Sequence, residues 1–135
     1  MSDHHYIEHR PWGSYEILSE FKVNEPGFSD SCVKILRLKP GGKLSYQSHQ
    51  KRNEHWFVVQ GKGMVVLNDR EIPVAVGSFV DIKISDKHRA INTSKDQELI
   101  IVETQTGHYD EDDIERFQDD YGPRKETGYR GKFVK

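Results

Sequence analysis

The chain of 135 residues lacks several features that would assign it to a particular class. Its single cysteine, Cys32, excludes a disulfide within the chain. No apolar run approaches the roughly 20 residues of a membrane-spanning helix, and the N-terminal segment has no apolar stretch of the signal-peptide kind. Lys and Arg number 20 against 22 Asp and Glu, a net charge of −2, so no charge imbalance favours nucleic acid or an anionic membrane. We therefore expect a soluble, cytoplasmic protein with no nucleic-acid or membrane partner.

A long helical repeat of apolar residues is also missing, which argues against a parallel βαβ architecture. Between Ser14 and Gln105, β-rich runs of about five residues are separated by turn signals such as Pro40-Gly41-Gly42 and Asn68-Asp69. Short strands at this spacing are typical of a β-barrel or sandwich. We predict one all-β domain over residues 1–135, with its barrel core at about residues 10–107.

The segment that follows the barrel core is strongly acidic. Within residues 110–121, Ile114, Phe117 and Tyr121 recur at i, i+3 and i+7, which predicts a short C-terminal helix packed on the barrel by one apolar stripe. Residues 124–135 are basic, and we expect a flexible tail or an arm on a partner subunit.

Four potential metal ligands lie close together in the predicted strands. Gln47 and His49 are two residues apart, so their side chains share one side of a strand, and Glu54 begins the next strand after a polar turn. His88 lies in a later turn that can return to the same interior. Two imidazoles, a carboxylate and an amide oxygen suit a divalent cation, most of all Zn²⁺, with Mn²⁺ or another divalent ion as alternatives.

The spacing of these residues resembles the first motif of the cupin family, which is Gly, five residues, His, one residue, His, three or four residues, Glu, six residues, Gly. Here the motif reads Gly41, Gln47, His49, Glu54 and Gly61, with Gln in place of the first His. The resemblance implies a double-stranded β-helix, the jelly-roll barrel of cupins, with Gln47, His49 and Glu54 as ligands.

The second cupin motif is Gly, five residues, Pro-x-Gly, two residues, His, three residues, Asn. Here Gly77, His88 and Asn92 fit the spacing, while residues 83–85 read Lys-Ile-Ser instead of Pro-x-Gly. The match implies that His88 is the remaining ligand.

Further segments resemble type II phosphomannose isomerase, in which such a cupin forms the C-terminal domain of a bifunctional enzyme. The segments that carry this resemblance are Arg10-Pro11-Trp12-Gly13-Ser14-Tyr15, Leu44-Ser45-Tyr46-Gln47, Glu54-His55-Trp56 and Glu111-Asp112-Asp113-Ile114-Glu115-Arg116-Phe117. The resemblance implies a metal-dependent isomerase of mannose 6-phosphate and fructose 6-phosphate, a phosphorylated sugar as the partner molecule, and a homodimer.

Isomerisation also needs a base and groups that bind the anionic substrate. Glu103 is the best internal candidate for the base, because a carboxylate in an otherwise apolar strand is costly unless it is used or paired; an ion-paired Glu at a strand edge is the alternative. Lys43 and Arg89 are candidate phosphate or oxyanion partners, with exposed surface cations as the alternative. We expect Arg52 to be a solvated turn residue and His55 to face away from Glu54.

Two other functions remain open at this point. The first is a non-catalytic cupin that binds a sugar or sugar nucleotide. The second is a metal-dependent cupin dioxygenase, against which the Gln ligand and the isomerase-like flanking segments argue.

Overall fold

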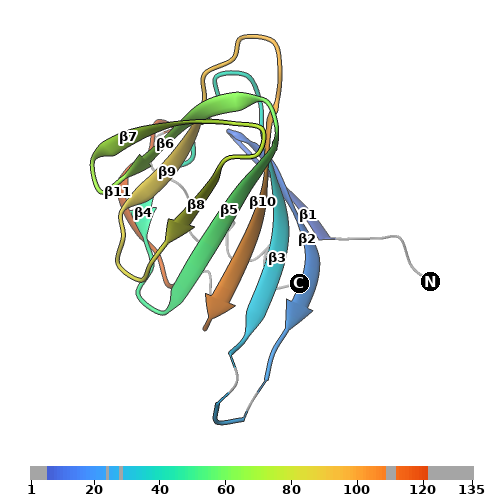
Figure 1. Cartoon of the computed structure of the whole chain (residues 1–135), viewed down its shortest axis with the longest axis vertical. Coiled ribbons are helices and arrows are strands. Elements are labelled where there is room, and N and C mark those ends of the chain that lie inside the picture. The colour runs from blue at the N-terminus through green and yellow to red at the C-terminus, as the bar shows by residue number, and fades with distance from the viewer. Residues whose placement is uncertain (1–5, 24, 28, 109–111, 122–135) are drawn as a thin grey trace, which may run out of the picture.

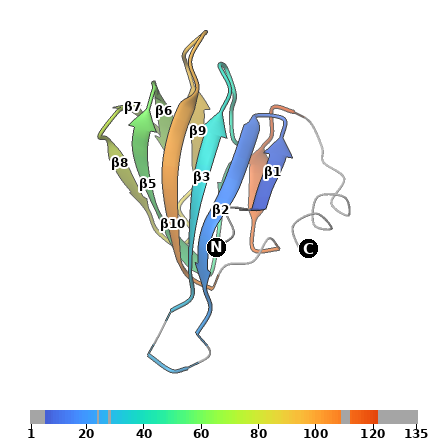
Figure 2. The same ribbon diagram turned by 90° about the vertical axis from the view of Figure 1, so that its right-hand side faces the viewer.

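A computed structural model describes residues 6–23, 25–27, 29–108 and 112–121, which form two antiparallel sheets. The larger sheet has the order β1-β2-β3-β10-β5-β8 and faces the viewer in Figure 2. Its strands are β1 (Tyr6–Arg10), β2 (Gly13–Phe21), β3 (Ser31–Leu38), β5 (Arg52–Gln60), β8 (Phe79–Ile82) and β10 (Leu99–Gly107).

The smaller sheet has the order β11-β4-β9-β6-β7 and lies to the left of the larger one in Figure 1. Its strands are β4 (Tyr46–Ser48), β6 (Lys62–Leu67), β7 (Arg70–Ala75), β9 (His88–Asn92) and β11 (Glu115–Gln118). The predicted all-β, double-sheet barrel is therefore confirmed. No helix among the described residues has the length and apolar character needed to cross a membrane.

Strict alternation along β5 decides which side chains face the interior. Arg52, Glu54, Trp56 and Val58 are buried, while the residues between them are half-buried or exposed. Trp56 and Val58 pack into the apolar core between the sheets. Two charged residues therefore occupy interior positions at the N-terminal end of the same strand whose other inward residues form the core.

The β1–β2 turn depends on Gly13, the last residue of the Arg-Pro-Trp-Gly segment. Its φ is 150°, and a Cβ atom at this position would lie 1.9 Å from the carbonyl oxygen of Arg37. Because that neighbour is backbone of the adjacent strand β3, only glycine lets β2 and β3 pair here.

The predicted helix over residues 110–121 is wrong for the part that the structure describes. Residues 115–118 form strand β11 instead, which pairs with β4 and places Glu115 opposite Ser48 and Arg116 opposite Gln47. The free edge of β4 offers backbone hydrogen-bond partners that a local apolar period cannot reveal. Residues 109–111 and the basic tail at 124–135 lie outside the described residues.

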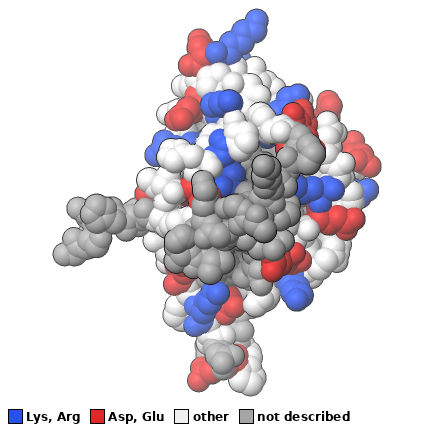
Figure 3. Space-filling model, turned by 180° about the vertical axis from the view of Figure 1, so that it is seen from behind, with Lys and Arg blue, Asp and Glu red and all other residues white. Residues whose placement is uncertain are grey.

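The charged side chains are mixed on the face seen from behind in Figure 3, where blue and red residues alternate around the undescribed grey segment. This distribution agrees with the nearly balanced charge of the chain.

Candidate metal centre

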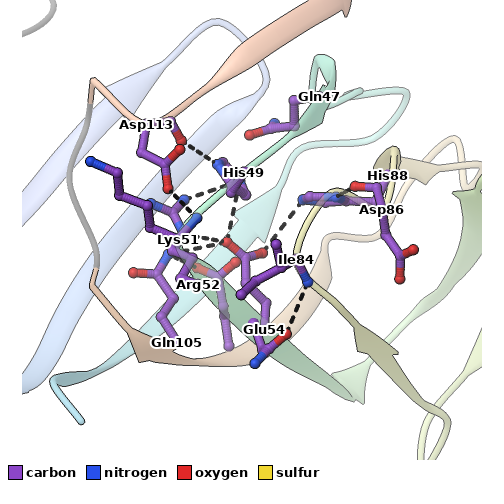
Figure 4. A network of polar contacts seen from close by, with 12 residues as sticks. Gln47, His49, Lys51, Arg52, Glu54, Ile84, Asp86, His88, Gln105 and Asp113 are labelled. Atoms are coloured by element: carbon purple, nitrogen blue, oxygen red, sulfur yellow. Dashed lines mark hydrogen bonds and ion pairs between the residues drawn. The ribbon is translucent and has the colours of Figure 1, made fainter.

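Glu54 lies at the centre of a buried cluster between the two sheets (Figure 4). Its Oε2 atom is 2.8 Å from Nε of Arg52 and 3.3 Å from Nε2 of His49, and its Oε1 atom is 3.6 Å from Nε2 of His88. One ligand atom from each of His49, Glu54 and His88 can be chosen so that all three lie within 4.8 Å of one another. The structure thus brings together three of the four predicted ligands.

Both imidazole rings are oriented by backbone carbonyl groups. Nδ1 of His49 lies 2.7 Å from the carbonyl oxygen of Asp113, and Nδ1 of His88 lies 2.9 Å from that of Asp86. A carbonyl oxygen only accepts hydrogen bonds, so Nδ1 of each ring carries a proton and Nε2 is the nitrogen left to bind a metal. Both Nε2 atoms are on the side of Glu54, which is the arrangement found around metal-binding histidines.

The charges of the cluster also suit a cation. Burial lowers the pKa of His49 to about 4, so this ring is neutral at pH 7. Burial alone would raise the pKa of Glu54, but the Arg52 guanidinium and the two imidazoles hold it well below its usual value. Oε1 of Glu54 is buried and accepts no hydrogen bond from a described residue. An ionised carboxylate with an unsatisfied oxygen, beside the Nε2 atoms of two imidazoles, fits a divalent cation.

Gln47, the fourth predicted ligand, lies on β4 directly opposite His88 in the β4–β9 ladder. It is half-buried and lines the same cavity, and its Nε2 atom donates to the carbonyl and hydroxyl oxygens of Ser45, both at 3.1 Å. Its coordination of a metal stays a prediction.

The loop before β5 is fixed by Asp113, which belongs to the acidic segment after the barrel. The Asp113 carboxylate accepts hydrogen bonds from the backbone N–H groups of Gln50 and Lys51, both at 2.9 Å, while its carbonyl orients His49. This segment therefore supports the cluster directly, a role that its acidic composition did not indicate.

Glu103 lies in the cavity beside the cluster, buried among polar partners. Nε1 of Trp56 donates to its Oε2 atom at 2.8 Å, and Nε2 of Gln105 donates to its Oε1 atom at 3.2 Å. Burial and the nearby Glu54 raise the pKa of Glu103 to about 8. Its predicted position inside the barrel is confirmed, and its catalytic role stays a prediction.

The structure does not bring Lys43 and Arg89 into this cavity. Nζ of Lys43 lies 3.2 Å from Oδ2 of Asp120, and Nη2 of Arg89 lies 2.9 Å from Oδ1 of the same residue. Nε of Arg89 donates to the carbonyl oxygen of Leu44 at 2.9 Å. Neither residue is among the described residues that line the cavity, so their predicted contact with a substrate has no support from this geometry.

Sequence reasoning missed the cations that line the cavity, two of which lie on strands of the larger sheet. The prediction that Arg52 is a solvated turn residue is wrong, because it is buried and its Nη2 lies 3.1 Å from Nε2 of His49. Lys34 is buried on β3 between the inward residues Cys32 and Leu36. In each case the sequence signal is that the cation lies an even number of residues from apolar or ligand positions of the same strand, so that these side chains face the same side. His55, by contrast, is exposed beside Asp81, so the prediction that it faces away from Glu54 is confirmed.

The fold and the His49–Glu54–His88 cluster define a cupin-like barrel with a candidate metal site. The chain belongs to the family described as "Mannose-6-phosphate isomerase C-terminal", whose model matches residues 1–119. It is 39% identical over 122 residues to the alginate biosynthesis protein AlgA of Pseudomonas aeruginosa, covering 90% of this chain and 24% of that protein. It is 36% identical to the xanthan biosynthesis protein XanB of Xanthomonas campestris over 87% of this chain and 24% of that protein.

The chain therefore spans about a quarter of the length of these curated relatives. Among solved structures, the capsular polysaccharide assembling protein CapF of Staphylococcus aureus matches with a TM-score of 0.69 at 21% identity, over 87% of this chain and 34% of that one. At that identity the similarity shows the fold alone.

Proposed function

We propose that this domain interconverts mannose 6-phosphate and fructose 6-phosphate with the help of a divalent cation. The observation that carries the proposal is the ionised, buried Glu54 between two imidazoles, in a cavity that also holds the second carboxyl group, Glu103. Membership of the mannose-6-phosphate isomerase C-terminal family supports the same reaction.

In this proposal His49, Glu54 and His88, with Gln47 as the fourth ligand, would hold the cation, with zinc favoured and manganese as the alternative. The bound cation would polarise the substrate oxygens at C1 and C2. The chain itself must move a proton from C2 to C1, while the hydroxyl proton passes from O2 to O1. Glu103 would take the proton at C2 and return it at C1, and the N–H groups of Trp56 and Gln105 would keep its carboxyl group in place.

A coupled assay with mannose 6-phosphate tests the reaction, using the protein loaded with Zn²⁺ or Mn²⁺. We expect turnover in the wild type and a loss of at least about 100-fold in Glu54→Gln, together with loss of bound metal. Glu71→Gln makes the same chemical change at an exposed position of β7 and serves as the control. Absence of turnover with every divalent ion would refute the isomerase proposal. Saturable sugar binding without turnover would favour a non-catalytic sugar-binding cupin, and oxygen consumption with iron would favour a dioxygenase.

We also propose that the domain forms a homodimer in the cytoplasm through the outer face of its larger sheet. Phe57 and Phe79 are cross-strand partners there, and they remain 40% and 62% exposed. Val102 continues this apolar surface as the cross-strand partner of Phe57 on β10. A contiguous apolar surface of this kind favours association. The buried, unpaired Cys32 is in keeping with a reducing compartment.

A further inference from the structure

Lys34 lies at an unusual position for a lysine, because it is buried and lines the cavity that holds Glu54. In the larger sheet it lies directly opposite Glu103 on β10, and Glu103 in turn lies opposite Trp56 on β5. Lys34 is only 5% exposed, and its Nζ atom is 4.6 Å from the centre of the Tyr15 ring. Because a buried lysine costs desolvation free energy, such a position calls for a use of its charge.

The charged side chains of the cavity leave an excess of positive charge. Among the described residues that line it, Lys34, Arg52 and Arg116 face only two carboxylates, Glu54 and Glu103. The excess is therefore at least one positive charge, because burial raises the pKa of Glu103 to about 8, and a divalent cation at Glu54 would add two more. A cavity with such an excess favours an anionic ligand, and a phosphate group carries a charge of about −1.5 to −2 at pH 7.

The three cations differ in how they can meet that anion. Arg52 already contacts both Glu54 and His49. Arg116 lies opposite Gln47 in the β11–β4 ladder, next to the predicted ligands. Lys34 lies two strand spacings and two residues along the strand from Glu54, a diagonal of about 12 Å between backbone positions from which both side chains extend into the cavity.

A hexose 6-phosphate has a comparable length. Six covalent bonds separate C2 from phosphorus, which gives roughly 7–8 Å in an extended chain. With the C1–C2 end of the sugar at the His49–Glu54–His88 cluster, the phosphate group reaches the side of the cavity where Lys34 lies. We propose that Lys34 binds the phosphate group of a phosphorylated sugar and thereby selects phosphorylated over neutral sugars. This inference rests on the substrate class of the proposed function.

Binding of a hexitol phosphate separates this inference from the isomerase reaction, because glucitol 6-phosphate has no carbonyl group and cannot isomerise. Calorimetric titration of the zinc-loaded, full chain with glucitol 6-phosphate and with glucitol measures the preference for the phosphate group. We expect Lys34→Met to weaken binding of glucitol 6-phosphate by about 10- to 100-fold and to leave glucitol binding unchanged. Lys34→Arg should restore most of the affinity, since it restores the charge.

Lys83→Met, which removes a lysine at an exposed position, is the matched control. If Lys34→Met does not fold, the comparison of Lys34→Met/Glu103→Gln with Glu103→Gln replaces it, because the double variant leaves no buried carboxylate opposite the missing lysine. Wild-type affinity in the folded lysine variant would overturn the inference, even if mannose 6-phosphate is turned over. Failure of the wild type to prefer glucitol 6-phosphate over glucitol would overturn it as well. A tenfold or larger loss in a protein without isomerase activity would support the Lys34 role and refute only the reaction.

Discussion

The buried contact between Arg52 and Glu54 makes a quantitative prediction for Arg52→Met. The two side chains are 8% and 2% exposed, and Nε lies 2.8 Å from Oε2. Methionine keeps much of the apolar stem but removes the guanidinium that faces the buried Glu54 carboxylate. Removing one partner of a buried ion pair typically costs about 3–5 kcal/mol, so the free energy of unfolding without metal should fall by at least about 3 kcal/mol.

A divalent cation should recover part of this loss, because it supplies positive charge to the same carboxylate. At a concentration 100 times its Kd, a ligand that binds only the folded state adds about 2.7 kcal/mol. Urea unfolding followed by tryptophan fluorescence, in EDTA and in Zn²⁺, measures both quantities. Lys51→Met, at the exposed neighbouring position, is the control. An Arg52→Met free energy within about 1 kcal/mol of wild type in EDTA would refute the argument.

The difference in free energy of unfolding between wild type and Arg52→Met depends on pH through the Glu54 carboxyl group. Its pKa in the folded state is held below the ordinary 4.5 by Arg52 and the two imidazoles, against the opposing effect of burial. A depressed carboxyl pKa contributes stability that is present above the unfolded pKa and is lost as the pH falls toward the folded pKa. The difference between wild type and Arg52→Met in EDTA should therefore be complete at pH 7 and shrink below pH 4.5. A difference that stays constant through that range would contradict the assignment to Glu54.

Four further predictions concern other parts of the barrel. Glu103→Gln should lower kcat for mannose 6-phosphate by about 100-fold or more with little change in metal content; a change confined to KM would contradict its role as base. Gly13→Ala should lower the free energy of unfolding by roughly 2–4 kcal/mol, because its Cβ meets the Arg37 carbonyl, and a neutral result in urea unfolding would exclude this clash. Cys32, whose pKa burial raises to about 11, should resist iodoacetamide at pH 8 until urea unfolds the protein; rapid native labelling would contradict its burial. Phe79→Glu should shift the mass measured by light scattering from dimer to monomer, whereas Val76→Glu, an equally exposed apolar position outside this cross-strand surface, should not.

The sequence was sufficient to predict that His49, Glu54 and His88 cluster, because their placement depends on local rules and motif spacing. The two-residue spacing of Gln47 and His49 on one strand, and the position of Glu54 at the start of the next, follow from alternation. In the structure Gln47, His49 and Glu54 line one cavity and His88 lies opposite Gln47 in the β4–β9 ladder, although β4 ends at Ser48, one residue before His49. Alternation also placed His55 outside the barrel, and the cost of a carboxylate in an apolar strand placed Glu103 inside it.

Residues 110–121 show where local reasoning failed. The apolar period of Ile114, Phe117 and Tyr121 indicated a helix, but the unpaired edge of β4 turned residues 115–118 into strand β11. The hydrogen-bond partners of β11 lie on β4, a segment distant in sequence, so no local pattern contains this information. Asp113 could therefore not be identified as the residue that orients His49.

The sequence by itself determined the all-β class and the clustering of His49, Glu54 and His88, because side-chain alternation and motif spacing are properties of the local chain. The tertiary structure alone decided that Arg52 and Lys34 belong to the interior, while Lys43 and Arg89 engage Asp120 instead. Lys and Arg side chains are usually exposed to solvent. Only the packing of the two sheets shows which of them are buried beside the interior carboxyl groups.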